Sequence, residues 1–314
     1  MRGRAMSALM LFLDGVGIGS RDPEVNPLFA ARMSALRSIL GGELPSLHNR
    51  RVSSTQASHI PIDATLGVSG LPQSGTGQTA LFTGFNGARI VGRHFGPHPY
   101  STLRPIIQQH NIFRQLQDAG KSVLFANAFP QRFFDYVSEK RSRLSVTTFS
   151  CLSCGVPLMR EKELRAGEAI SADITNAGWH GLGYPSLPLV TPEEAGKRLA
   201  RLSRGHDFVL FEYWKTDHAG HSMNRREALL ALEAFDGLLE GVLSELDGAR
   251  SLLLITSDHG NIEDLSIKTH TRHPVPLVIY GAGHQGFVRR IEQDGNTDLT
   301  SITPALVRCI LNHH

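Results

Sequence analysis

Cysteine is scarce in this chain, and no apolar run is long enough to cross a membrane. Three cysteines among 314 residues leave one unpaired in any disulfide scheme, which suits a reducing compartment better than a disulfide scaffold. A membrane span needs about 18 consecutive apolar residues. The apolar start of the chain resembles a signal peptide, but it is short, leads directly into Asp14 and has no small-residue cleavage site. We therefore expect a cytoplasmic protein without a membrane partner.

A strong charge of one sign is also missing. The chain has 32 Lys and Arg against 29 Asp and Glu, a formal net charge of +3, with no long basic block. This balance gives no support for a nucleic-acid partner, although a basic pocket for a small anionic substrate is compatible with it. The hydrophobic fraction of 41% is ordinary for one large domain, or one domain with an insertion. Nothing in the composition indicates an oligomeric state.

Short apolar runs alternate with amphipathic stretches. Because strands buried on both faces are almost continuously apolar, we predict five strands: Ala8–Leu13, Val123–Ala128, Phe208–Tyr213, Leu252–Thr256 and Val275–Tyr280. Helical spacing or capping residues predict helices that begin at Asn26-Pro27, Thr191-Pro192, Arg225 and Thr303-Pro304. This alternation predicts an α/β fold, a doubly wound and mostly parallel sheet with helices on both faces.

The segment from about 129 to 188 interrupts this alternation with polar and small residues. We interpret residues 1–314 as a single domain with this segment as a small inserted cap over the site. The segment contains Cys151-Leu-Ser-Cys154. No second cysteine pair or suitable histidine pair accompanies it, so we expect free thiols rather than a zinc or redox site.

Acidic residues and histidines lie where the predicted strands end. Asp14 and Asp258-His259 close two strands, and Asp217 follows a third. Ligands gather at the carboxyl ends of parallel strands, so these groups are expected to meet. Asp217 and His221 are four residues apart, and His270 and His273 precede the last strand. Each motif alone also fits a turn, a polar loop or a surface group, but this oxygen and nitrogen set suits two divalent ions, manganese or zinc.

The glycine-rich segment from Gly70 to Gly84 is the second informative region. It contains the hydroxyls of Ser74, Thr76 and Thr79, and its later part has a helical pattern. A hydroxyl at a glycine-rich helix start lies beside backbone N–H groups, where an anion can bind. A metal beside it would make the hydroxyl a nucleophile. The other interpretation is a capping residue on a flexible turn.

With these motifs in view, the chain resembles the alkaline phosphatase superfamily of metalloenzymes, and especially its branch with cofactor-independent phosphoglycerate mutase and phosphopentomutase. The resemblance covers about residues 6–95 and 190–314, with the motifs in the family's order. It implies that Asp14, Asp258, His259 and the nucleophile hold one metal. It implies that Asp217, His221 and His270 hold the other. Ser74 matches the family's nucleophile, since Gly77 and Gly84 have the expected spacing.

Departures from the family pattern affect the substrate. Gln78 stands where the mutases usually have histidine, and His273 replaces what is often a small polar residue. The chain is also too short for the large inserted domain of the phosphoglycerate mutases. Candidate phosphate contacts are Arg93, His94, Lys215 and His273, all near motif residues, although Arg93 and Lys215 equally fit solvated surface charges.

The resemblance therefore implies a two-metal enzyme that transfers or hydrolyses the phosphoryl group of a small phosphomonoester through a phosphoserine intermediate. Manganese is favoured by the mutase-like motifs, and zinc is possible. The alternatives are a phosphomutase that moves phosphate within one small substrate, and a non-catalytic metal-binding sensor on the same fold.

Overall fold

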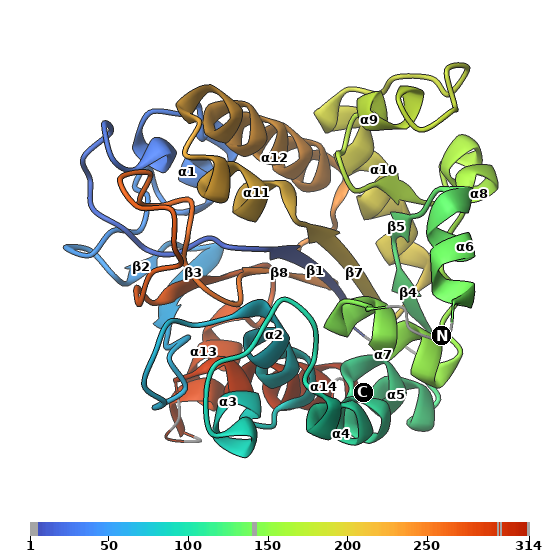
Figure 1. Ribbon diagram of the computed structural model, residues 1–314. Coiled ribbons are helices and arrows are strands. Elements are labelled where there is room, and N and C mark those ends of the chain that lie inside the picture. Colours follow the sequence, from blue (N-terminus) through green and yellow to red (C-terminus); the bar gives the residue numbers. More distant parts are fainter. Residues whose placement is uncertain (1–5, 140–142, 294, 296, 313–314) are drawn as a thin grey trace.

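A seven-stranded sheet in the order β2-β3-β9-β8-β1-β7-β4 forms the centre of the computed structural model (Figure 1). The structure describes residues 6–139, 143–293, 295 and 297–312, so the first residues of the chain lie outside it. The strands of this sheet are β1 (Ser7–Leu13), β2 (Val52–Ser53), β3 (Ala57–Ile62), β4 (Val123–Phe125), β7 (Phe208–Tyr213), β8 (Ser251–Thr256) and β9 (Val275–Tyr280). A separate two-stranded sheet pairs β5 (Asn127–Ala128) with β6 (Ile170–Ser171).

The predicted α/β sheet is confirmed, with an antiparallel flank that the sequence did not reveal. Strands β8, β1, β7 and β4 are parallel neighbours, whereas β9 runs antiparallel to β8 and to β3. Strand β3 escaped prediction because Ser58, His59 and Pro61 interrupt its apolar pattern. The predicted strand Val123–Ala128 is divided between the two sheets, since the chain leaves the large sheet after Phe125.

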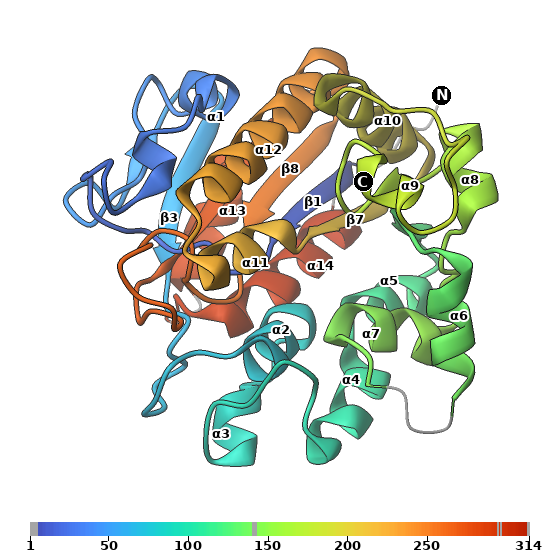
Figure 2. The ribbon, with the colours of Figure 1, turned by 45° about the horizontal axis from the view of Figure 1, so that its top comes forward.

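Helices cover both faces of the sheet, as Figures 1 and 2 show for α10 and α12 on one face and α2, α13 and α14 on the other. Alternate residues of β1 explain this arrangement, because Met10 and Phe12 pack into one core cluster while Leu9 and Leu11 pack into the other. The helices of the regions outside 129–188 are α1 (Ser34–Ile39), α2 (Ser74–Thr83), α3 (Gly87–Val91), α4 (Arg104–His110), α5 (Ile112–Asp118), α10 (Pro192–Gly205), α11 (Lys215–Ser222), α12 (Arg225–Glu245), α13 (His284–Gln293) and α14 (Ile302–Asn312). Short 3-10 turns are η1 (Pro27–Phe29), η2 (Ser101–Leu103) and η3 (Leu299–Ser301).

The predicted helix starts are mostly close to the observed ones. Thr191 caps α10 by accepting a hydrogen bond from the Glu194 backbone N–H, and α12 begins at Arg225. The helix predicted from Asn26 is wrong as a single element. It is divided into η1 and α1, because the Asn26 side chain caps only a 3-10 turn. None of the helices in the described ranges is long and apolar enough to cross a membrane.

The segment 129–188 contributes to both the main core and a small core of its own. It contains α6 (Gln131–Ser138), α7 (Val146–Cys154), α8 (Glu161–Ala166), β6 and α9 (Ala177–His180). Val146 and Cys151 of α7 pack into the main core, whereas Leu164 and Trp179 belong to a separate apolar cluster. Cys151 and Cys154 are free thiols. Burial raises the pKa of Cys151 well above its usual range, so this thiol is not a reactive thiolate.

Two glycines allow α10 and α12 to pack backbone against backbone. A Cβ added at Gly241 would lie 1.9 Å from the Glu193 carbonyl oxygen, and one added at Gly196 would lie 1.9 Å from the Leu238 carbonyl oxygen. Any larger residue at either position must push the helices apart. This close contact fixes α10 and α12 as one layer over β1 and β7.

Gly241→Ala should therefore lower the free energy of unfolding by about 2 kcal/mol or more, because overpacking outweighs the gain in helix propensity. Gly205→Ala is the matched control at the end of α10, where an added Cβ meets nothing within 4 Å. It should leave stability unchanged or raise it by up to about 1 kcal/mol. Urea unfolding of both variants measures this, and equal stabilities would contradict the packing argument.

Candidate metal centre

The candidate site forms where three neighbouring parallel strands end. Strand β1 lies between β7 and β8, with Leu13 paired to Tyr213 and Phe12 paired to Thr256. Asp14 directly follows β1, and Asp258 and His259 follow β8. Helix α11 begins just after β7 and carries the remaining carboxylate of the predicted set. The register therefore brings all three carboxylates to one edge, as the sequence predicted.

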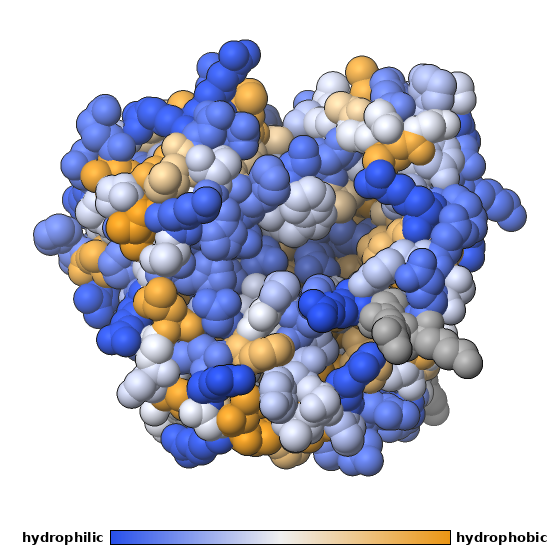
Figure 3. Space-filling view, in the orientation of Figure 1, coloured by the Kyte–Doolittle hydropathy of each residue, from blue (hydrophilic) through white to orange (hydrophobic). Residues whose placement is uncertain are grey.

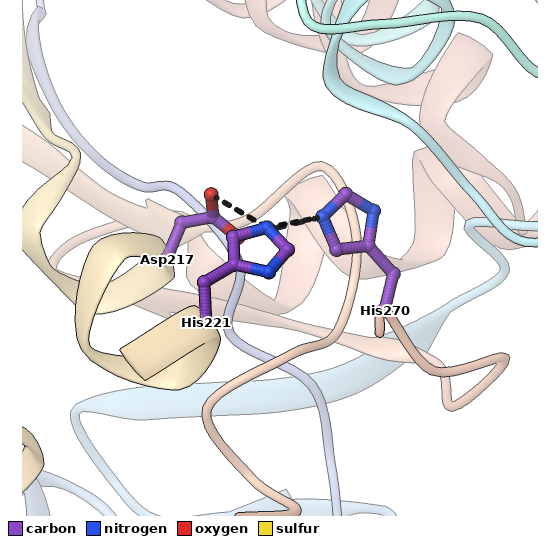
Figure 4. Close-up of side chains that lie close together, drawn as sticks. All are labelled: Asp217, His221 and His270. Atoms are coloured by element: carbon purple, nitrogen blue, oxygen red, sulfur yellow. Dashed lines mark hydrogen bonds and ion pairs between the residues drawn. The ribbon is translucent and has the colours of Figure 1, made fainter. Parts of the chain in front are cut away.

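Asp217, His221 and His270 form the first group of ligands, and they converge from α11 and the loop before β9 (Figure 4). His221 Nε2 lies 3.4 Å from Asp217 Oδ2, and His270 Nε2 lies 3.6 Å from Asp217 Oδ1. The two Nε2 atoms are 3.1 Å apart. All three side chains therefore direct a possible ligand atom to the same point.

The other ring nitrogens of these histidines explain why this point suits a cation. His270 Nδ1 is 2.7 Å from the Pro72 carbonyl oxygen, and His221 Nδ1 is 2.9 Å from the Lys268 carbonyl oxygen. A carbonyl only accepts, so each Nδ1 carries a proton, and in the neutral form of each ring Nε2 presents a lone pair. Burial and the charge of His259 lower the pKa of His270 to about 4, which keeps its ring neutral. Two lone pairs and a carboxylate facing one another fit a divalent metal.

The second group surrounds His259, which is fully buried. Its Nε2 lies 3.3 Å from Asp14 Oδ1 and 3.6 Å from Asp258 Oδ2. Asp14, His259 and Asp217 all offer ligand atoms within 4.8 Å of one another, so Asp217 adjoins both groups. Asp14 Oδ1 is buried and accepts no hydrogen bond from any residue that the structure describes. These oxygen and nitrogen atoms are of the kind that a divalent ion binds.

Electrostatics agree with a site made for cations. Burial, followed by the charge of Asp258, raises the pKa of Asp14 well above its usual range. Burial likewise raises the pKa of Asp258. Burial disfavours a charged His259, but Asp258 and Asp14 outweigh it and raise the His259 pKa to about 10. Ligation by His259 would therefore release a proton and tie metal affinity to pH.

Ser74 is the hydroxyl that reaches this cluster. It is the first residue of α2, and its Oγ lies 3.0 Å from His259 Nε2. Thr76 and Thr79 instead donate to carbonyl oxygens of Gln73 and Gly75, near their own helix start. Of the three candidate hydroxyls, only Ser74 has a side-chain partner among the predicted ligands, which supports its choice as nucleophile.

The close approach of α2 depends on its glycines. A Cβ at Gly77 would lie 2.8 Å from the Asp258 carbonyl oxygen, and one at Gly75 would lie 2.3 Å from the His98 carbonyl oxygen. Gln78, one turn further along α2, donates to Asp258 Oδ2 at 3.1 Å. The residue that departs from the mutase pattern thus orients a ligand carboxylate.

Asn261 and Glu263 stabilise the site through hydrogen bonds to a ligand carboxylate and to the loops that carry the ligands. Asn261 Nδ2 donates to Asp217 Oδ1 at 2.7 Å. Glu263 is fully buried and accepts from the backbone N–H groups of Gly17 and Asn261, at 2.9 and 2.7 Å. It also accepts from Thr271. Glu263 thereby ties the loop after β1 to the loop between β8 and β9, a role that its sequence pattern did not reveal.

The four predicted phosphate contacts lie on three separate segments of the chain. Arg93 and His94 line a shallow pocket beside the loop that precedes α2, with His94 Nε2 3.2 Å from the Val68 carbonyl oxygen. His273 Nδ1 lies 3.1 Å from Glu263 Oε1. Lys215 is the first residue of α11. Within the described residues, none of the four makes a hydrogen bond or ion pair to a predicted ligand, so their contact with phosphate stays a prediction.

Glu212 is a site neighbour that sequence reasoning missed. It lies in β7 and is buried, and its Oε2 accepts a 2.5 Å hydrogen bond from Thr147 Oγ1. Burial, with the charge of Asp258 nearby, raises its pKa to about 7. A carboxyl inside the apolar run Phe208–Tyr213 was the available signal, because buried carboxyls are rare without a task.

Comparisons with known proteins bear on the family and on the fold. Residues 186–312 match the family model described as the Metalloenzyme superfamily. The alkaline phosphatase from the Antarctic bacterium TAB5 superposes with a TM-score of 0.53 at 11% identity, covering 99% of this chain and 100% of that chain. The C-terminal part of this chain thus resembles the metalloenzyme superfamily, and the chain has the alkaline phosphatase fold. The Thermus thermophilus alkaline phosphatase gives a TM-score of 0.53 at 12% identity, covering 99% of this chain and 92% of that chain.

Curated relatives of this chain include 2,3-bisphosphoglycerate-independent phosphoglycerate mutases. The Roseobacter denitrificans protein is 34% identical over 104 residues, which cover 29% of this chain and 20% of the mutase. The Saccharophagus degradans protein is 32% identical over 133 residues, which cover 40% of this chain and 25% of the mutase. The chain thus matches a fifth to a quarter of the length of these two relatives.

The raised pKa of Glu212 predicts that the stability of the metal-free protein, kept in chelator, depends on pH. Its pKa is raised on folding from 4.5 to about 7, so its contribution to stability is complete below pH 4.5 and is lost as pH rises to about 7. As pH rises from 4.5 to 7, the free energy of unfolding of the wild type should fall by about 3 kcal/mol relative to that of Glu212→Gln. Denaturant unfolding at several pH values measures the difference. Glu240→Gln, on the exposed face of α12, is the control, and parallel stability curves for Glu212→Gln and wild type would refute the raised pKa.

Proposed function

We propose that this protein is a two-metal phosphoryl-transfer enzyme that acts on a small phosphomonoester through Ser74. The observation that carries the proposal is the convergence of two Nε2 lone pairs and the Asp217 carboxylate beside a second carboxylate and imidazole group that contacts Ser74. Asp217, His221 and His270 would hold one ion. Asp14, Asp258, His259 and Ser74 would hold the other.

Bound divalent ions would lower the pKa of the serine hydroxyl and offset phosphoryl charge. Ser74 Oγ then attacks phosphorus, the ester P–O bond breaks, and the departing alcohol takes up a proton. Ser74 opens α2, a ten-residue helix, so the positive end of the helix dipole faces the phosphoryl group. Gln78 and Asn261 keep the Asp258 and Asp217 carboxylates in place. The product of this step is a phosphoserine.

The phosphoserine can react in two ways. Attack by water on phosphorus releases inorganic phosphate and regenerates Ser74, which is a phosphatase reaction. Return of the phosphoryl group to another hydroxyl of the same alcohol is a mutase reaction, the activity named for the curated relatives. Hydrolysis is the activity we favour, because water alone suffices as the second acceptor of the phosphoryl group. Manganese is the proposed metal on the likeness of the motifs to the mutases, and the nitrogen-rich group at His221 also suits zinc.

Ser74→Ala should lower turnover of phosphomonoesters by about a thousandfold or more, because the attacking oxygen is lost. A panel of phosphomonoesters with manganese or zinc measures phosphate release. Ser69→Ala is the control, an exposed serine on the loop before α2 whose loss should leave turnover unchanged. Metal content of Ser74→Ala should stay at two ions per chain, and full activity in this variant would refute the nucleophile.

His270→Ala should reduce the metal content from two ions per chain to one, because His270 directs its Nε2 at Asp217 and His221. Elemental analysis after dialysis measures the count. His218→Ala is the control, since His218 lies on α11 between the proposed ligands but packs against Trp214, with ring centroids 6.1 Å apart. Two ions per chain in His270→Ala would exclude it as a ligand.

A further inference from the structure

A cavity of about 630 Å³ lies between α6, α9 and the start of α11. This volume is within the range of small-molecule sites in proteins. Trp214 and Lys215 line the cavity. Trp214 directly follows Tyr213, whose carbonyl oxygen accepts a hydrogen bond from the backbone N–H of the proposed ligand Asp14 at 3.1 Å. Figure 3 shows a hollow on this face, between the half that carries α11 and α12 and the half that carries α6 and α9. The cavity therefore adjoins the candidate metal centre.

The walls of the cavity are mainly aromatic. Phe129 and Phe133 stack with ring centroids 4.4 Å apart, and Trp179 closes another side. Helix α6 has no buried residue, although its sequence includes Phe133 and Tyr136. Tyr136 and Trp214 are 37% and 44% exposed. Apolar surface of this kind is costly to leave in water and suits an apolar ligand.

The polar groups of the cavity favour an anion. Arg132 and Lys215 line it, and neither makes an ion pair or side-chain hydrogen bond within the described part of the chain. The lining carboxylate of Asp173 already accepts from the backbone N–H groups of Asn176 and Gly178, at 3.1 and 2.6 Å. Two cations without a fixed partner, beside aromatic walls, complement a molecule with an anionic end and an aromatic end.

We infer that this cavity binds the alcohol part of the substrate and that this part carries an aromatic group. The inference rests on the proposed function and names its substrate class, an aryl-bearing phosphomonoester. The phosphate would lie toward Asp217 and Ser74, and the aromatic group between Phe133 and Trp179. A short polar phosphoester would leave the aromatic walls uncovered, so the site discriminates in favour of the longer ligand.

Binding can be measured without turnover, because both tryptophans of the chain, Trp179 and Trp214, line the cavity. Intrinsic fluorescence is titrated with 2-phenylethylphosphonate and with ethylphosphonate, in protein loaded with manganese. Hydrophobic pockets discriminate about tenfold or more for each apolar group of this size. The phenyl compound should therefore bind at least about tenfold more tightly and change the fluorescence, and equal affinities, or no binding of either, would overturn the inference.

Variants of cavity residues test whether the preference for the phenyl compound arises in the cavity. The affinity ratio is the affinity for 2-phenylethylphosphonate divided by the affinity for ethylphosphonate. Phe133→Ala should reduce this ratio to about threefold or less, since it removes one aromatic wall. Ala172→Leu, which narrows the cavity from another side, should do the same and serves if Phe133→Ala does not fold. Leu189→Ala removes an apolar side chain that is 61% exposed and should keep the full ratio. If folded Phe133→Ala or Ala172→Leu kept the affinity ratio of the wild type, the assignment of this cavity as the aromatic subsite would be overturned.

Turnover of the matching esters separates the two proposals. 2-Phenylethyl phosphate should exceed ethyl phosphate in kcat/KM by about tenfold or more, because their alcohols leave similarly. Selective phosphonate binding without phosphate release from either ester would support the cavity and refute hydrolysis. Release from both esters at equal kcat/KM would support hydrolysis and refute the cavity as a subsite.

Discussion

The mutual repulsion of three carboxylates at one sheet edge is the constraint on which the rest of the site depends. The parallel register of β7, β1 and β8 places Asp14, Asp217 and Asp258 together, and burial makes their charges costly. Raised pKa values for Asp14 and Asp258 express this cost. Divalent cations relieve it best, and the surrounding helices and loops serve to hold the carboxylates where such ions can bind.

Much of this site could be predicted because its residues follow apolar strands. A strand that is buried on both faces has a clear sequence pattern, and the residue after it has a known place at the edge of the sheet. Asp14, Asp258 and His259 are of this kind. Ser74 was predictable for a different reason, since its glycine-rich surroundings are needed for close backbone approach to Asp258.

The parts that escaped prediction depend on contacts distant in sequence. Glu263 reads as one acidic residue in a polar loop, and only the fold shows that it joins Gly17 to Asn261. Strand β3 has no continuous apolar pattern, since Ser58, His59 and Pro61 interrupt it, and only its pairing with the distant β9 shows it as part of the sheet. The aromatic cavity combines residues from 128–136, 171–182 and 214–215, whose association no local pattern indicates.

The reversal of direction at β9 has a further consequence. Because β9 runs antiparallel to β8, the connection formed by residues 257–274 leaves and re-enters the sheet at the same edge. A parallel strand would receive the chain at the opposite edge and could bring only its own C-terminal residues to the site. Here a single connection supplies Asp258 and His259 to one ligand group and His270 to the other. The two proposed ions would then be linked mechanically, so that disorder introduced anywhere in this connection weakens both together.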